Sequence, residues 1–191
     1  MKKYKIGVYG SAIDEGEEII KKAQELGGEL ALKKVITIIG ANSGLPHETA
    51  KRATEKGGEL WCYPPCTDTQ ELKKMYPEVS QSMYSKIFYI PKLFEFKDNI
   101  MVQRKYRNVI STANCDAGII ISGRWGSLNE FTNLIDYGKI IGVLTGTGGI
   151  ADELPDLMKK IKKEGSGKVL FSSSPKELVE KIIYELPGKV R

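Results

Sequence analysis

Short apolar runs rich in β-branched residues alternate with longer amphipathic stretches along the whole of this 191-residue chain. Apolar runs without a period of two are expected where strands are buried on both faces, as in a parallel sheet. The amphipathic stretches provide the crossover helices that parallel strands need. The sequence therefore predicts an α/β fold, a three-layer sandwich around a mostly parallel sheet. The seven predicted strands are Tyr4–Tyr9, Val35–Ile39, Leu60–Tyr63, Ile87–Ile90, Ala117–Ile121, Ile140–Leu144 and Val169–Phe171, and the first predicted helix is Glu15–Leu32.

The fifth predicted strand leads through a glycine-rich turn directly into a helix. Gly123 and Gly126 let the backbone turn sharply and let a ligand approach without meeting a Cβ atom. Ser127 to Glu130 then form the first helical turn, whose unpaired N–H groups and dipole favour an anion. Any strand-to-helix crossover needs a turn, so a purely structural role stays open. Glu130 favours function, because a carboxylate beside an anion site is costly unless it grips hydroxyls or manages a proton.

Three more glycine-containing turns follow predicted strands. They are Gly10-Ser11, the turn from Gly40 through Gly44 to Pro46, and the turn from Gly146 through Gly148 to Gly149. Ligands of α/β proteins bind at the carboxyl ends of parallel strands, so the four turns together predict a nucleotide site. The chain lacks G-x-G-x-x-G after its first strand and also lacks the Walker G-x-x-x-x-G-K-[ST] run. This argues against standard dinucleotide binding and against P-loop ATPase activity.

A predicted helix, Ile100–Ser111, precedes the glycine-loop strand and carries polar side chains on two faces. Arg104 and Arg107 share one face, as do Lys105 and Asn108, because residues three apart are neighbours on a helix. A solvated helix surface accounts for such charges without any ligand. The alternative is a guanidinium that clamps a phosphate or orients a carboxylate at the sheet edge.

The composition is that of a soluble globular domain. With 41% hydrophobic and 28% charged residues and no interdomain linker, the chain is expected to form one domain over residues 1–191. No apolar run is long enough for a membrane span and no secretory signal is evident, so we expect a cytoplasmic protein. The formal charge is +5, and its densest cluster indicates a solvated helix face rather than a nucleic-acid patch. That cluster is Lys159, Lys160, Lys162 and Lys163.

The cysteines and the single histidine do not form a familiar metal site. Cys62 and Cys66 have no second ligand pair nearby, Cys115 stands apart, and His47 completes no zinc set. A disulfide needs an oxidising or thermophilic setting, so we expect three reduced thiols, no metal and no cofactor. The segment Pro64–Ser85 has little periodicity, which indicates an excursion at the sheet edge with a lid as its candidate role.

The glycine loop resembles the signature of the Lonely Guy family, nucleoside 5′-monophosphate phosphoribohydrolases within a wider Rossmann-like superfamily. That signature is P-G-G-x-G-T-x-x-E after a strand, with an Arg-Lys pair on the preceding helix. Gly123, Gly126 and Glu130 keep their places, and Arg107 stands nine residues before Asp116, as is typical of the family. The turns Tyr9–Ser11 and Gly40–Leu45 are also similar to the superfamily's first two loops, so the resemblance covers most of the chain.

The resemblance implies a Rossmann-like fold and hydrolysis of the N-glycosidic bond of a purine nucleoside 5′-monophosphate. Glu130 and Arg107 are the implied catalytic residues: Glu130 holds ribose hydroxyls or positions water, and Arg107 anchors the glutamate or the phosphate. The implied ligand-binding residues are Gly10, Ser11, Gly40, Gly44, Arg104, Asn108, Gly123, Arg124, Gly126, Ser127 and Gly148. The expected partners are a nucleoside monophosphate or related phosphorylated molecule and a second copy of the chain, with neither membrane nor nucleic acid.

Several residues depart from the signature and keep other functions open. Arg124 replaces the second glycine, where it either binds the phosphate itself or blocks the pocket. Asn108 stands where lysine is frequent, and the Arg107-Asn108 pair is similar to uncharacterised and molybdenum-cofactor-carrier-like proteins. The second hypothesis is therefore a non-catalytic carrier or sensor of a nucleotide or molybdenum cofactor, and the third is single-stranded DNA binding. A homodimer is implied, with Phe131, Leu134 and Ile135 either at its interface or packed on the sheet.

Overall fold

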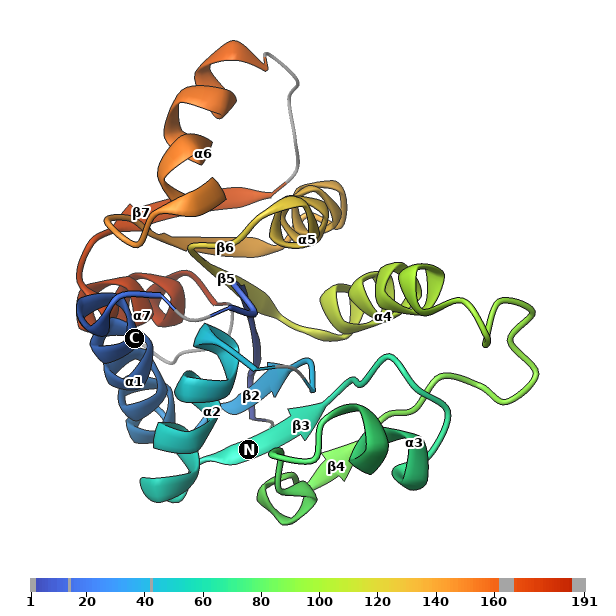
Figure 1. The fold of residues 1–191 in the computed structure, drawn as a ribbon. Coiled ribbons are helices and arrows are strands. Elements are labelled where there is room, and N and C mark those ends of the chain that lie inside the picture. The colour runs from blue at the N-terminus through green and yellow to red at the C-terminus, as the bar shows by residue number, and fades with distance from the viewer. Residues whose placement is uncertain (1–2, 14, 42, 162–166, 187–191) are drawn as a thin grey trace.

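The computed structural model describes residues 3–13, 15–41, 43–161 and 167–186. Within these ranges seven strands form one parallel sheet in the order β4-β3-β2-β1-β5-β6-β7 (Figure 1), which confirms the predicted fold class. The predicted lysines Lys162 and Lys163 and the turn residue Asn42 lie outside the described residues. The strands are β1 (Lys5–Gly10), β2 (Ile36–Ile39), β3 (Glu59–Cys62), β4 (Lys86–Ile87), β5 (Ala117–Ile121), β6 (Ile140–Leu144) and β7 (Lys168–Ser172).

The described ranges contain seven α-helices, six of which cover the two faces of the sheet, while α3 belongs to the edge segment Pro64–Ser85. Helices α1, α2 and α7 pack together on one face, whereas α4, α5 and α6 lie on the other (Figure 1), giving the three layers predicted. Among the described residues, no helix is long and apolar enough to cross a membrane. The helices are α1 (Glu17–Leu32), α2 (Leu45–Glu55), α3 (Thr69–Met75), α4 (Ile100–Asn114), α5 (Trp125–Asp136), α6 (Gly149–Lys160) and α7 (Pro175–Glu185).

Strand β5 lies inside the sheet between β1 and β6 and is buried along its whole length, which explains its unbroken apolar sequence. A Cβ atom at Gly118 would lie 2.4 Å from Leu134 Cδ1, so this glycine lets α5 pack closely on the sheet. Phe131 and Leu134 are buried in this contact, and Ile135 packs against the same cluster. Of the two roles considered for these side chains, the structure therefore supports packing on the sheet.

The crossing of α1 and α2 gives a matched pair of stability predictions. A Cβ atom at Gly27 would lie 2.1 Å from the Thr49 carbonyl oxygen, whereas one at Gly28 would lie 4.0 Å from Arg52 Cγ. We expect Gly27→Ala to lower the free energy of unfolding by about 1–3 kcal/mol through overpacking. Gly28→Ala is expected to raise it by about 0.5–1 kcal/mol, because alanine is the better helix former. Urea denaturation measures both, and equal effects would contradict the close α1–α2 contact.

The fourth strand is shorter than the predicted Ile87–Ile90 and ends at Ile87. Its ladder with β3 stops after the pair Cys62–Ile87. Directly after Cys62 and Tyr63 the opposite segment contains Pro64 and Pro65, which have no N–H group to continue a ladder. The first helix likewise begins at Glu17 rather than at the predicted Glu15.

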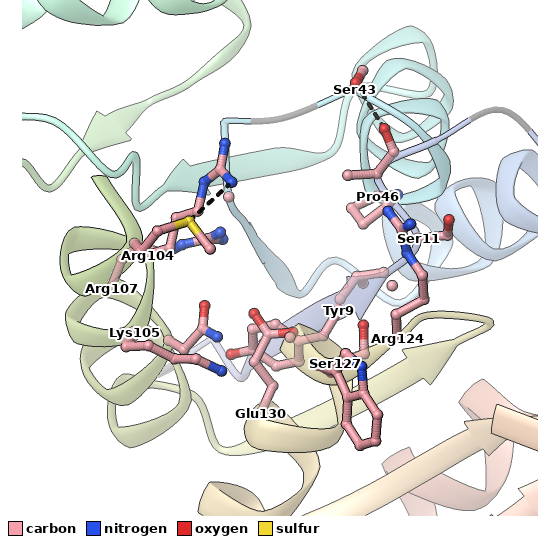
Figure 2. Close-up of a pocket in the computed structure, with 18 of the residues that line it drawn as sticks. Tyr9, Ser11, Ser43, Pro46, Arg104, Lys105, Arg107, Arg124, Ser127 and Glu130 are labelled. Atoms are coloured by element: carbon pink, nitrogen blue, oxygen red, sulfur yellow. Dashed lines mark hydrogen bonds between the residues drawn. The ribbon is translucent and has the colours of Figure 1, made fainter. Parts of the chain in front are cut away.

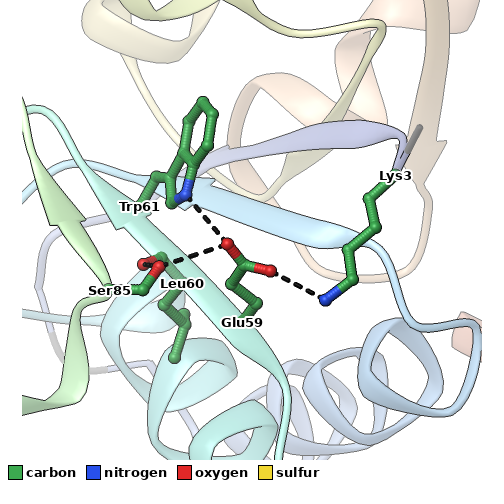
Figure 3. Close-up of polar contacts among 5 residues, drawn as sticks. All are labelled: Lys3, Glu59, Leu60, Trp61 and Ser85. Carbon is green, nitrogen blue, oxygen red and sulfur yellow. Dashed lines mark hydrogen bonds and ion pairs between the residues drawn. The ribbon is translucent and has the colours of Figure 1, made fainter. Parts of the chain in front are cut away.

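Glu59 connects the beginning of β3 to three neighbouring side chains (Figure 3). Its Oε2 accepts from Lys3 Nζ at 2.8 Å, and its Oε1 accepts from Trp61 Nε1 at 3.2 Å and Ser85 Oγ at 3.4 Å. The hydrogen bond from Lys3, followed by those from the other donors, lowers the pKa of Glu59. These contacts hold the edge strand in register, since the Ser85 N–H also donates to the Leu60 carbonyl oxygen at 2.9 Å.

The segment Pro64–Ser85 is an excursion at the sheet edge, as predicted, but much of it belongs to the core. It contains α3 and a short 3-10 helix, Gln81–Met83, and it buries Cys66, Leu72, Val79 and Tyr84. All three cysteines of the chain are free and buried. Burial raises the pKa of Cys62 and of Cys66 to about 12 each. The excursion therefore anchors β4, and its role as a lid remains a prediction.

Candidate functional site

The candidate site lies where the chain changes direction across the sheet. From β1 the order runs through β2 to β4 on one side and from β5 to β7 on the other, so the segments that follow the paired carboxyl ends of β1 and β5 diverge. A cavity of about 520 Å³ opens there, a volume within the range of small-molecule sites, roughly 300–1,000 Å³. Its wall is built from the end of β1, the start of α2, one face of α4, and the loop and first turns of α5.

The loop between β5 and α5 has the geometry of an anion cradle. Ser122 and Gly123 both have positive φ, +50° and +97°, which turns the chain sharply so that α5 begins at Trp125. A Cβ atom at Gly123 would lie 2.3 Å from Ser127 Oγ, so the turn requires glycine. The first N–H groups of α5 have no partner within the helix, and the Arg124 side chain at its start makes no capping hydrogen bond to them. At Gly126 a Cβ atom would contact nothing within 4 Å, so a ligand has room to approach.

The turn from Gly146 to Gly149 supports this cradle from behind. The Ser122 N–H donates to Thr147 Oγ1 at 2.8 Å, and the Ile150 N–H donates to the Gly123 carbonyl oxygen at 2.8 Å. Gly148 precedes α6 and donates its N–H to Asp152 Oδ2 at 2.8 Å. This turn therefore fixes the conformation of the glycine loop, and Gly148 is not among the described residues that line the cavity.

Four cationic side chains line the cavity (Figure 2). Arg104, Lys105 and Arg107 extend from α4, whose beginning is capped by Asn99, and Arg124 lies on the opposite side. Among the described residues, no carboxylate forms an ion pair with any of the four. The buried Nε of Arg107 also has no hydrogen-bond partner among the residues that the structure describes. Unpaired cations around one cavity favour an anionic ligand.

Glu130 lies at the base of the cavity and is only 6% exposed. Its burial raises its pKa from 4.5 to about 7, although the charges of Arg107 and Lys105 act to lower it. The Asn108 amide nitrogen, in the orientation that satisfies its neighbours, donates to Glu130 Oε1 at 3.0 Å. A carboxyl that titrates near neutral pH is suited to accepting or donating a proton during a reaction.

Tyr9 lies beside Glu130 in the wall of the cavity and is buried. Burial, with the nearby Cys115 and Glu130, raises the pKa of Tyr9 well above its usual range. The phenol is therefore neutral, and its hydroxyl donates to Cys115 Sγ at 3.9 Å. Within the described ranges, no group of three or more histidine, cysteine, aspartate or glutamate side chains could hold a metal ion.

Most of the site residues predicted from the sequence meet in this cavity. The ten that line it are Gly10, Ser11, Gly40, Arg104, Arg107, Asn108, Arg124, Gly126, Ser127 and Glu130. Gly44 and Gly123, like Gly148, are not among the described lining residues but shape the adjoining turns: a Cβ atom at Gly44 would lie 2.3 Å from the Ser11 carbonyl oxygen. The binding and catalytic roles of all these residues remain predictions.

Other residues that line the cavity were not assigned as binding residues from the sequence, although several lie in the turns and the helix that were predicted to form the site. They include Tyr9, Ser43, Pro46, Tyr76, Met101, Lys105 and Trp125. Trp125 could have been assigned from its position inside the glycine loop, and Lys105 from the helix face that it shares with Asn108. Tyr76 had none, because it follows α3 in the irregular excursion.

Comparisons with solved structures agree with this fold. The X-ray structure of TM1055, a structural genomics target, matches with a TM-score of 0.72 and 19% identity, covering 95% of this chain and 99% of that chain. The molybdenum cofactor carrier protein of Chlamydomonas reinhardtii matches with a TM-score of 0.66 and 19% identity, covering 97% and 98%. DNA processing protein A of Helicobacter pylori, described for its single-stranded DNA binding mode, matches with a TM-score of 0.63 and 17% identity, covering 96% of this chain and 81% of that chain.

These identities are low, so the likenesses establish the fold alone. No curated protein sequence matches the chain significantly. A family model, by contrast, matches residues 3–179, which is nearly the whole chain. The protein therefore belongs to the SLOG cluster4 family.

Proposed function

We propose that this protein binds a purine nucleoside 5′-monophosphate in the cavity at the carboxyl end of β1 and hydrolyses its N-glycosidic bond. The observation that carries this proposal is the Glu130 carboxyl, which is buried beside cations in the cavity wall and has a pKa of about 7. Such a carboxyl exchanges its proton near neutral pH, as general acid–base catalysis requires. The resemblance of the glycine loop to the Lonely Guy signature supports the same reaction.

In this proposal the phosphate binds at the first turn of α5. The free N–H groups and the helix dipole favour an anion there. The open space over Gly126 admits the phosphate, and the guanidinium of Arg124 supplies a further donor. Arg107 is then free to act on Glu130 or on the sugar side of the ligand.

The reaction breaks the bond between ribose C1′ and the base nitrogen and forms a bond between C1′ and a water oxygen. The base leaves with the bonding electron pair, so the ribose acquires oxocarbenium-like positive charge. The Glu130 carboxylate stabilises this charge and accepts the proton of the attacking water. The released base takes up one proton, so that the products are free base and ribose 5-phosphate. Incubating the protein with AMP, GMP and an N6-substituted AMP, followed by chromatography, tests for both products.

Replacing Arg107 gives a prediction specific to its position. We expect Arg107→Ala to lower kcat/KM for base release by about 10- to 100-fold, the loss of a charge-assisted contact. The acidic limb of the pH–rate profile should also move to higher pH, because the Arg107 charge lowers the pKa of Glu130. The control is Arg52→Ala, an exposed arginine on α2 paired with Glu55 at 2.9 Å. If the acidic limb does not move, the charge of Arg107 does not lower the pKa of Glu130 in the working protein.

A carrier of a nucleotide or molybdenum cofactor is the second candidate function. Arg124 favours it, since its exposed guanidinium occupies the loop position where the Lonely Guy signature has glycine. The fold likeness to the Chlamydomonas molybdenum cofactor carrier supports it as well. Mass spectrometry of the denatured purified protein tests this function. A retained ligand with no base release supports a carrier, and an empty protein that turns over monophosphates contradicts it.

Single-stranded DNA binding is the third candidate. The unpaired cations of the cavity and the fold likeness to the Helicobacter DNA processing protein favour it. Fluorescence anisotropy with a labelled oligonucleotide at about 50 and about 200 mM salt tests it. Affinity that does not fall steeply with salt would exclude a phosphate-backbone interface of several contacts.

The proposal also retains a homodimer. Since Phe131 and Leu134 are buried in the core, its interface requires other surfaces. Light scattering at micromolar concentration tests it, and a monomer would contradict it.

A further inference from the structure

Two tryptophans of this chain have opposite environments. Trp61 on β3 is half-buried; its Nε1 donates to Glu59, Lys86 Nζ lies 4.7 Å from its ring centroid, and Phe88 packs against it at 5.3 Å. Trp125 is 81% exposed, and within the described residues it has no aromatic partner, no cation over its ring and no place in a core cluster. The fold accounts for Trp61 but gives Trp125 no packing role.

Trp125 lies at the rim of the cationic cavity. It is the first residue of α5, between Arg124 and Gly126, and all three line the cavity. Met101, which is 65% exposed, lines the same cavity from α4, and Tyr76 lines it from the excursion. The cavity therefore combines a charged wall with exposed apolar and aromatic side chains. That combination complements a ligand with an anionic group at one end and a flat apolar ring at the other.

We propose that the Trp125 indole stacks on the planar heterocycle of the bound ligand. The site then recognises a purine nucleoside monophosphate by its ring as well as by its phosphate, and binds a phosphosugar without a ring more weakly. This inference rests on the proposed function in one respect: the phosphate must bind in this cavity. It does not require hydrolysis, so it applies equally to a carrier.

Stacking on an exposed indole suits the chemistry of the rim. The face of an aromatic ring accepts any purine, because every base has a π surface, and each stacked base strengthens binding by roughly 5- to 150-fold. The adjacent Arg124 guanidinium can contact the phosphate while the indole contacts the ring, because both side chains belong to the loop and first residue of α5.

Calorimetric titration with AMP and with ribose 5-phosphate, made throughout on the full chain carrying Glu130→Gln so that AMP is not turned over, separates ring recognition from phosphate recognition. With Trp125 in place, this protein is expected to bind AMP at least about tenfold more tightly than ribose 5-phosphate. Trp125→Ala should weaken AMP binding by about tenfold or more and change the affinity for ribose 5-phosphate by less than about twofold. Trp125→Phe keeps an aromatic face and should restore most of the lost affinity for AMP.

Tryptophan fluorescence gives a second readout with a matched control. Rapid mixing with AMP, before any turnover, should quench the fluorescence of Trp61→Phe, which retains Trp125, and leave that of Trp125→Phe nearly unchanged. In the calorimetric titrations, an affinity for AMP that Trp125→Ala leaves unchanged would overturn the inference while leaving the phosphate site intact. A wild-type protein that binds neither AMP nor ribose 5-phosphate would overturn the phosphate site and this inference together.

Discussion

Glu130→Gln is expected to lower the rate of base release from a purine monophosphate by about 100-fold or more while the protein stays folded. Glutamine has nearly the same shape and keeps an oxygen toward Asn108, so the cavity is preserved. It can neither accept the proton of the attacking water nor carry the negative charge that stabilises the oxocarbenium-like ribose. Chromatographic initial rates, with circular dichroism as the folding check, measure the effect.

The matched control is Glu153→Gln, an exposed glutamate on α6 away from the cavity. Its rate should equal that of the wild type. If Glu130→Gln also retains the wild-type rate, the glutamate has no part in the reaction. A ligand that remains bound to both the wild-type and the Glu130→Gln protein, with no base released by either, would instead favour the carrier function.

The second large effect concerns stability and has a defined dependence on pH. Burial raises the pKa of Glu130 from 4.5 to about 7, so between these pH values the folded protein holds a proton that the unfolded chain releases. The glutamate therefore lowers the free energy of unfolding as pH rises through this interval. Glutamine does not titrate, so the stability of Glu130→Gln relative to wild type should increase by up to about 3 kcal/mol between roughly pH 4.5 and pH 8.

Urea denaturation of both proteins at several pH values measures this difference. Below about pH 4.5 the free energies of unfolding of the two proteins should change with pH in nearly the same way. The difference between them should then grow as the pH approaches 8. Glu153→Gln should follow the wild type throughout. A gap that stays constant with pH would contradict a raised pKa at Glu130, and with it the assignment of this carboxyl as the acid–base group.

These two predictions describe one physical conflict. A buried carboxyl that must ionise in its cavity destabilises the fold, and the same property gives it a proton to exchange near neutral pH. Replacing a catalytic group of this kind is therefore expected to give a protein that is inactive but more stable at pH 8.

The strands at the centre of the sheet were predictable because burial on both faces leaves a clear pattern. The structure confirms Ala117–Ile121 and Ile140–Leu144 with the predicted bounds. The edge strand at Lys86–Ile87 was harder, because its length depends on prolines in the segment opposite. Helix α3 was also missed, although Asp68 accepts hydrogen bonds from the N–H groups of Gln70 and Glu71, a capping signal that the sequence contains.

The sequence predicted where the site lies in the fold, but not how the residues around it contact one another. Four turns at the carboxyl ends of parallel strands indicate one ligand crevice, and the cavity lies there. Sequence alone could not show that the Gly148 turn packs behind the glycine loop instead of facing the ligand. It also could not show that burial would outweigh the charges of Arg107 and Lys105 at Glu130, because that balance depends on how the helices α4 and α5 pack.

The most direct test of the account is to quantify both products after incubating the protein with AMP, GMP and an N6-substituted AMP. The account predicts that at least one monophosphate yields free base and ribose 5-phosphate in equal amounts with the wild-type protein, and that both products disappear with Glu130→Gln. No free base from any of the three, in a protein that binds them, would contradict hydrolysis at this site.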